Sequence, residues 1–400
     1  MTGPNLTLRL QILGFALLLL LAVLAGCGFS DNHSNNSNNG GTGPSDGSGN
    51  ISGRYVYVAD AADAGGAFAW KLDSAGNLSE VPGSPFTLPA GGNLQGALAA
   101  SGGFVYVVNR PVETGGAAIH SFKADASTGA LTQKGKPVTI TTPSDSDIRQ
   151  MRLSPSESTA YAVTQFNLIS ISLNNGSPAL LNTQAAANGE VFGVAVGSQF
   201  VFAGTQDGNP KQGFAQPVIK RFVVNSDSSL GAGQVVTTLT DANIPRGIAM
   251  DPAGKFLAVT TGTNNDSVTI FSVGSDGSLT KAGTGPTNGR NGHALEFDPS
   301  GKFLYALTSE DPVPNQESVV VFSVGADGSL TSVQTLDLPS GVRNGGFKVT
   351  TDFVIVVNNS VGGIDSSIVV LRRDSSSGQL SSGSSINGVK PLGEIDTLVF

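Results

Sequence analysis

The stretch "SVGSDGSLTKAG" at residues 272–283 decides the fold, because the chain repeats it as "SVGADGSLTSVQ" at residues 323–334. Looser versions, with an Asp or Asn, a few small residues and then a leucine, occur elsewhere along the chain. The marker leucines are separated by 53, 49, 50, 49, 51 and 50 residues, and they are Leu78, Leu131, Leu180, Leu230, Leu279, Leu330 and Leu380. A period of about 50 residues is typical of solenoids, arrays and propellers.

Each repeat predicts four strands joined by short turns. In one repeat, the segments 293–297, 302–307, 318–324 and 329–336 are rich in β-branched and aromatic residues. The turns "DPSG" and "GADG" separate them and carry Pro and Gly where tight turns favour these residues. Because no helical pattern appears, the repeats predict an all-β fold, a seven-bladed β-propeller of four-stranded antiparallel blades.

The two ends of the repeat region complement each other. The first repeat opens on "ISGRYVYV" at residues 51–58, which matches a second strand and lacks a first strand before it. The chain ends in "EIDTLVF" at residues 394–400, which matches a first strand. If Phe400 is followed directly by Asn50, the combined sequence aligns with "ALEFDPSGKFLYA", the first turn of another repeat with the strands on either side of it. We therefore expect residues 395–400 to pair into the blade formed by residues 51–92 and to close the ring without a free edge.

The N-terminus predicts a secreted and lipid-anchored protein. An apolar run at residues 12–24 follows Arg9, and it is too short for a typical spanning helix. The next residues, "LAGC" at 24–27, resemble the bacterial lipobox, in which Cys27 would carry the lipid. Gly28 stands where an inner-membrane retention Asp would be, so the resemblance implies the outer membrane of the cell envelope. An ordinary signal peptide with an incidental cysteine is the alternative.

Composition sets the domain organisation and excludes some partners. Residues 1–26 are predicted to be the signal peptide and 27–50 a tether, because 19 of the 23 residues at 28–50 are Gly, Ser, Asn or Asp. Residues 51–400 form the propeller. The net charge of −8 argues against nucleic acid. Cys27 is the only cysteine and the three histidines lie far apart, so we expect no disulfide within the chain, no metal site and no cofactor.

Propeller geometry predicts where a site would form. The first strand of each blade runs along the central channel, and the loops between blades and between second and third strands lie at the end where that strand begins. Long loops at residues 109–117, 205–217 and 309–316 lie on this entrance face. Variable loops on a rigid scaffold commonly carry binding residues.

Aligning the first strands brings charged residues from several repeats to the channel mouth. Arginines there can hold a carboxylate or phosphate through paired hydrogen bonds. His293 is the candidate general acid or base. The alternative is that strand starts are polar because they meet solvent in the channel. The aligned residues are Arg149, Arg246, His293 and Asp396, with Arg343, Arg290 and Glu190 within a few positions.

The pattern "FDPSGKFLYAL…SVVVFSVGADGSLT" resembles the lactonase-type seven-bladed propeller family, which includes bacterial 6-phosphogluconolactonase and fungal carboxy-muconate cyclase. The likeness covers residues 51–400 and is strongest at 243–334. It implies an Arg and His site on the channel face, often in a "PRH" segment. Here Pro245 and Arg246 lack the histidine, while His293 lacks the preceding Pro-Arg, and Glu310 loosely matches a glutamate after the second strand.

Two functions follow. The first is a lactone hydrolase in which His293 activates water and the arginines bind an anionic lactone. Its substrate is expected to differ from phosphogluconolactone, which is cytosolic, because the lipobox implies a place beyond the inner membrane. The second is a non-catalytic cell-envelope propeller that binds a glycan, peptide or protein through the same face. In either case we expect a monomer that touches the membrane only through its lipid.

Overall fold

The computed structural model describes the repeat region with gaps, and all the described residues fall in one compact unit, 46–400. The predicted signal peptide, Cys27 and the tether lie outside the described residues. So do Arg343 and most of each of the three long entrance loops. The described ranges are 54–60, 66–88, 92–111, 117–140, 148–207, 216–239, 244–261, 267–288, 290–310, 317–339, 346–358, 367–387 and 395–399.

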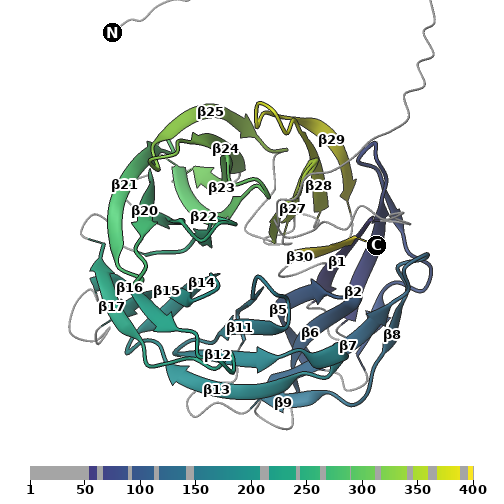
Figure 1. Cartoon of the computed structure of the whole chain (residues 1–400). Coiled ribbons are helices and arrows are strands. Elements are labelled where there is room, and N and C mark those ends of the chain that lie inside the picture. The colour runs from purple at the N-terminus through teal and green to yellow at the C-terminus, as the bar shows by residue number, and fades with distance from the viewer. Residues whose placement is uncertain are drawn as a thin grey trace, which may run out of the picture. The chain divides into compact units, whose positions relative to one another are not determined.

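Seven antiparallel sheets follow one another around a common centre (Figure 1). In six of the sheets the strand nearest the centre comes first in the chain, and the following strands pair outward in order, whereas in the seventh the C-terminal strand takes the central position. The only helical segment in the described part of the chain is the short 3₁₀ turn η1 (Asn174–Gly176). The predicted all-β, seven-bladed propeller is therefore confirmed.

The blades are numbered in chain order. Blade 1 contains β1 (Arg54–Asp60), β2 (Gly66–Leu72), β3 (Leu78–Glu80), β4 (Phe86–Thr87) and the C-terminal β30 (Ile395–Val399). Blade 2 contains β5 (Gly92–Ser101), β6 (Phe104–Pro111), β7 (Ala117–Ala124), β8 (Leu131–Gln133) and β9 (Val138–Ile140). Blade 3 contains β10 (Gln150–Leu153), β11 (Thr159–Val163), β12 (Asn167–Ser172) and β13 (Ala179–Ala185).

The remaining blades have four strands each. Blade 4 contains β14 (Glu190–Val196), β15 (Phe200–Asp207), β16 (Gln216–Val223) and β17 (Gln234–Thr238). Blade 5 contains β18 (Ile248–Met250), β19 (Phe256–Thr261), β20 (Ser267–Val273) and β21 (Leu279–Pro286). Blade 6 contains β22 (Arg290–Phe297), β23 (Phe303–Glu310), β24 (Glu317–Val324) and β25 (Leu330–Asp337). Blade 7 contains β26 (Phe347–Val349), β27 (Phe353–Asn358), β28 (Ser367–Arg373) and β29 (Leu380–Asn387).

The C-terminal strand completes the first blade, in a register that the sequence does not predict. β30 pairs antiparallel with β1 and places Thr397 opposite Val56. The register expected from the sequence places Phe400 opposite Val56 instead, so the observed pairing differs from the expected one by three residues. In the other blades a short turn connects the first two strands and fixes their register. No turn connects β30 to β1, so turn geometry sets no register for this pair.

The repeated "DG" segments form the turns between third and fourth strands. In blade 5, Asp276 Oδ1 accepts a hydrogen bond from Ser278 N at 2.9 Å, and in blade 6 Asp327 makes the same contact with Ser329. Side chains of this type close a turn on their own backbone. The sequence repeat therefore marks a repeated turn, as the strand prediction required.

The glycines of these turns meet an aromatic ring of the preceding blade. A Cβ atom on Gly378 of blade 7 would lie 2.3 Å from Cδ1 of Phe303 at the start of β23 in blade 6. Real Cβ atoms essentially never come this close, so only glycine fits the turn without movement. The same pairing recurs at six of the seven seams: Tyr55 with Gly129, Phe104 with Gly176, Phe200 with Gly277, Phe256 with Gly328, Phe303 with Gly378 and Phe353 with Gly76.

Tyrosine hydroxyls and one buried ion pair add polar contacts across the seams. The Tyr305 hydroxyl of blade 6 donates to the Gly378 carbonyl of blade 7 at 2.8 Å and accepts a hydrogen bond from Arg373 Nε at 2.9 Å. Arg373 Nη2 also pairs with Asp298 of blade 6, and both of these side chains are buried. Tyr57, Tyr106 and Tyr161 reach the following blade in the same way as Tyr305.

The hydrophobic core is divided among the spaces between blades. Val56 and Trp70 of blade 1, for example, pack in one cluster with Ile355 and Val370 of blade 7. Each blade is thus buried only when both neighbours are present. No helix in the described part of the chain is long and apolar enough to cross a membrane.

Candidate functional site

The predicted site lies where the first strands begin. His293 is within β22, while Arg149 and Arg246 come just before β10 and β18. The three residues therefore belong to blades 3, 5 and 6 at one end of the channel-lining strands.

Glycines let the starts of blades 5 and 6 approach each other closely. A Cβ atom on Gly292 would lie 2.5 Å from the Cβ of Thr260, and one on Gly247 would lie 2.8 Å from the Oγ1 of the same threonine. Gly247 N also donates a hydrogen bond to Thr260 Oγ1 at 2.8 Å. Arg246 precedes Gly247 and His293 follows Gly292, so the close packing brings their backbones together, near enough for the charge of Arg246 to act on His293.

His293 is held by a hydrogen bond and is uncharged at neutral pH. It occupies a β-bulge, since Gly292 pairs with Thr308 and Ala294 with Leu307, leaving the histidine without a partner across the strand. Its Nε2 lies 2.5 Å from Ser309 Oγ. Burial, and then the positive charge of Arg246, lower the pKa of His293 to about 4. The neutral ring can accept a proton at its second nitrogen.

Arg246 is the exposed cation of this pair. Its backbone is fixed, because Arg246 N donates to the Ile244 carbonyl at 3.0 Å and the preceding Pro245 packs against Gly204. Within the described ranges no side-chain hydrogen bond or ion pair involves its guanidinium, whose charge acts on His293. Such a guanidinium is placed to receive a carboxylate or phosphate of a ligand.

The second predicted arginine is neutralised within the protein. Arg149 Nη1 of blade 3 forms an ion pair with Glu190 Oε1 of blade 4, and both side chains are 37% exposed. Arg149 was predicted to lie at the channel mouth, with Glu190 within a few positions of the same column. The structure shows them paired with each other, and an exposed pair of this kind contributes roughly 0–1 kcal/mol to stability.

Two other predicted positions differ from the expectation. The Arg290 guanidinium bonds to Ser318 and lies 3.2 Å from Asp337 on the outermost strand of its blade, so it points away from the channel. Asp396 lies in β30 opposite Tyr57, the level that Glu296 occupies opposite Tyr305. The register of β30 therefore places the backbone of Asp396 three residues further from the channel entrance than the position equivalent to His293.

Ser309 was not predicted from the sequence; it follows Thr308 near the end of β23 and forms the hydrogen bond with His293. A charged group further along the first strands, made of Arg152, Glu296 and Lys348, was also not predicted. These three residues each lie two positions before the first turn of their blades, so aligning that column would have found them. Among the described residues, no three His, Cys, Asp or Glu side chains come close enough together to hold a metal ion.

Comparison with known proteins agrees with the fold. The family model described as Lactonase, 7-bladed beta-propeller matches residues 218–313. This stretch runs from β16 past the end of β23 and contains both Arg246 and His293. The resemblance to lactonase-type propellers is therefore confirmed. No curated protein matches the chain.

Solved structures share the architecture across most of the chain. A candidate 6-phosphogluconolactonase from Bacteroides fragilis has a TM-score of 0.65 at 18% identity and covers 87% of this chain and 98% of its own. A second, from Bacteroides uniformis, has a TM-score of 0.67 at 19% identity, with 87% and 100% covered. A protein of unknown function from Desulfotomaculum acetoxidans has a TM-score of 0.62 at 15% identity, with 86% and 98% covered. At these identities the likeness shows a shared fold alone.

Proposed function

We propose that the protein hydrolyses a lactone that carries a negatively charged group, at the entrance site of Arg246 and His293. The observation that carries the proposal is the imidazole of His293, held by Ser309 through Nε2, near the exposed guanidinium of Arg246, whose charge helps to lower the pKa of the histidine. A base and an anion-binding cation are the two parts that this reaction needs. The match to the lactonase family model supports it, because the match spans both residues.

The chemistry follows from the hydrogen bond to Ser309. In the tautomer in which His293 Nε2–H donates to Ser309 Oγ, the lone pair of Nδ1 takes a proton from water. The resulting hydroxide adds to the lactone carbonyl, the ring C–O bond breaks, and the released alkoxide recovers the proton to give a hydroxy acid. Arg246 binds the anionic group and holds the carbonyl near the base. Ser309 is a positioning residue, since it fixes the ring through Nε2.

A panel of lactones with and without a carboxylate or phosphate tests the proposal, with proton release as the readout. We expect His293→Ala to lower kcat by roughly a hundredfold or more. We expect Arg246→Ala to raise KM for the charged lactones, with a loss of about 1.5–3 kcal/mol in the free energy of substrate binding. Arg372→Ala removes an exposed arginine from the outer part of blade 7 and serves as the charge control. A wild-type protein that hydrolyses none of the panel excludes the lactonase function.

A binding function without hydrolysis is the second candidate. It is favoured by the Arg149–Glu190 ion pair, which neutralises Arg149 and leaves Arg246 to bind an anionic group at the described part of the entrance. A single cation is enough to bind the acidic group of a glycan, peptide or protein. Binding of an anionic ligand that weakens in Arg246→Ala, together with no turnover of any lactone, would select this function.

We propose the same location for either function: the cell envelope, with Cys27 as the lipid anchor. The support is the lipobox "LAGC" at residues 24–27. Cys27→Ser should release the protein into the periplasmic fraction in a cell fractionation experiment. A variant that stays with the membrane would show that the lipobox does not anchor the chain.

A further inference from the structure

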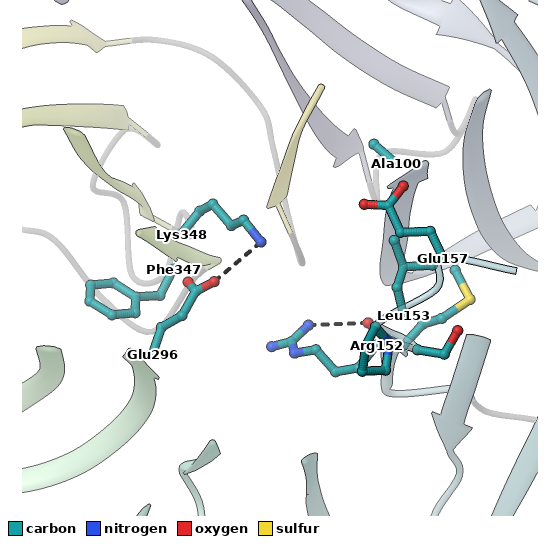
Figure 2. Close-up of a pocket in the computed structure, with 10 residues that line it drawn as sticks. Ala100, Arg152, Leu153, Glu157, Glu296, Phe347 and Lys348 are labelled. Carbon is teal, nitrogen blue, oxygen red and sulfur yellow. Dashed lines mark hydrogen bonds and ion pairs between the residues drawn. The ribbon is translucent and has the colours of Figure 1, made fainter. Parts of the chain in front are cut away.

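A cavity of about 330 Å³ lies at the other end of the first strands from the entrance residues, where these strands lead into the first turn (Figure 2). Its lining includes Arg152 and Glu157 of blade 3, Glu296 of blade 6 and Lys348 of blade 7. None of the entrance residues Arg246 and His293 takes part. This volume is within the usual range of small-molecule sites, about 300–1,000 Å³.

Equivalent positions on the first strands of the blades, which form one level of the channel, account for both the open volume of the cavity and its charged lining. Arg152 lies opposite Tyr161, Glu296 opposite Tyr305 and Lys348 opposite Ile355, which are equivalent positions in their blades. At the same level three other blades carry only a methyl group, on Ala99, Ala195 and Ala249. The short side chains leave room near the axis, and the long charged side chains extend into it.

The charged groups are held by the surrounding structure. Lys348 Nζ lies 3.2 Å from Glu296 Oε1, while Glu296 Oε2 accepts a hydrogen bond from Val349 N at 2.8 Å. On the opposite side, Arg152 Nη1 donates to the Met151 carbonyl at 3.1 Å. In Figure 2 the guanidinium of Arg152 and the ammonium of Lys348 both extend into the gap between the blades.

Glu157 adds a carboxylate that an ordinary turn would lack. It has a φ of 55° at the turn position where blades 5 and 6 have Gly254 and Gly301, each with a φ of 70°. A side chain in this left-handed conformation costs roughly 1–2 kcal/mol, and such residues concentrate at functional sites. Ser101 Oγ lies 3.1 Å from Glu157 Oε2 and fixes the carboxylate at the edge of the cavity.

We propose that this cavity binds a small zwitterion that carries both a carboxylate and an ammonium group, such as a free amino acid. Arg152 and Lys348 face the carboxylate, and Glu157 faces the ammonium group. A simple anion suits the lining less well, because its two cations are balanced by the two carboxylates of Glu157 and Glu296. The site is independent of the proposed lactonase function.

Isothermal titration with a ladder of zwitterions tests the proposal. The probes are L-alanine, γ-aminobutyrate and 6-aminohexanoate, with hexanoate and hexylamine as analogues that carry a single charge. We expect one member of the ladder to bind at least tenfold more tightly than both analogues. Equal binding of hexanoate would overturn the zwitterion assignment, and no binding by any ladder member would overturn the site.

Two variants connect the binding to the cavity. Glu157→Gly removes the carboxylate and restores the residue that the turn conformation favours, so the variant is expected to fold at least as well as the wild type. It should weaken zwitterion binding tenfold or more, as should Arg152→Met. The exposed Arg372→Met is the control and should bind normally. Unchanged affinity in Glu157→Gly would place the ligand elsewhere.

Discussion

Replacing Gly378 by alanine tests whether the aromatic–glycine contacts hold neighbouring blades together. The new Cβ would lie 2.3 Å from Cδ1 and 2.6 Å from Cε1 of Phe303. Phe303 is 7% exposed and packs within a cluster that spans blades 6 and 7. The ring therefore has little room to move away, and the turn of blade 7 must shift instead.

The expected cost has two parts. Alanine at the φ of 74° found for Gly378 costs about 1–2 kcal/mol, because its Cβ crowds the backbone in the left-handed region. Forcing an extra methyl group against a packed ring costs about 1–3 kcal/mol more. A shifted turn also disturbs the hydrogen bond that the Gly378 carbonyl accepts from the Tyr305 hydroxyl at 2.8 Å. We expect a total loss of about 2–5 kcal/mol in the free energy of unfolding.

Gly254→Ala is the matched control. Gly254 has a φ of 70°, but a Cβ there would have no heavy atom within 4 Å, so only the backbone cost applies. Urea unfolding followed by the fluorescence of Trp70, the single tryptophan, measures both variants, with circular dichroism as the test of a two-state transition. If the two variants lose the same free energy to within about 0.5 kcal/mol, the ring contact contributes nothing and the reasoning fails. Phe303→Leu in the Gly378→Ala background should recover part of the loss.

Three further outcomes are expected. Arg373→Met leaves the buried Asp298 unpaired and should cost about 3–5 kcal/mol in urea unfolding, whereas the exposed Arg372→Met should change little. Burial lowers the pKa of His120 from 6.5 to about 4, so the unfolded state binds more protons between these pH values. His120 should therefore contribute a loss of about 3 kcal/mol in the free energy of unfolding on going from pH 6.5 to 4, and His120→Leu should remove this part of the slope while the similar part from His293 remains. Deleting residues 395–400 removes β30 and exposes the edge of β1, so the truncated protein should unfold at lower urea concentration than the full chain.

The sequence predicts the blades well because strand pattern and turn chemistry repeat together. The expected strands at 302–307 and 318–324 correspond to β23 (Phe303–Glu310) and β24 (Glu317–Val324). Each is bounded by a turn whose Asp and Gly residues are recognisable in the printed sequence. The partner of each turn glycine was not predicted, because the ring that it contacts lies on another blade, roughly 75 residues away in the chain for Phe303 and Gly378.

The site is predicted less completely, because a column of the repeat fixes only where a backbone position lies. Arg149 and Arg246 share a column and both are exposed, yet Arg149 forms an ion pair with Glu190 while the charge of Arg246 acts on His293. The direction of each side chain depends on the neighbouring blade. At His293 it also depends on a β-bulge that the residue pattern does not predict. The position of Asp396 was also not predicted, because no turn connects β30 to β1 and sets the register of the two strands.

The two proposed sites occur where the repeat is broken. On the turn side, the aromatic–glycine contact is kept at six seams, and this regularity fixes the distance between blades. The charged level beside it varies freely, with alanine in three blades and Arg152, Glu296 or Lys348 in three others. At the entrance, Arg246 and His293 occupy one column with different side chains. The repeated seam contacts thus provide a regular spacing, and positions without seam contacts can differ from blade to blade and supply the chemistry.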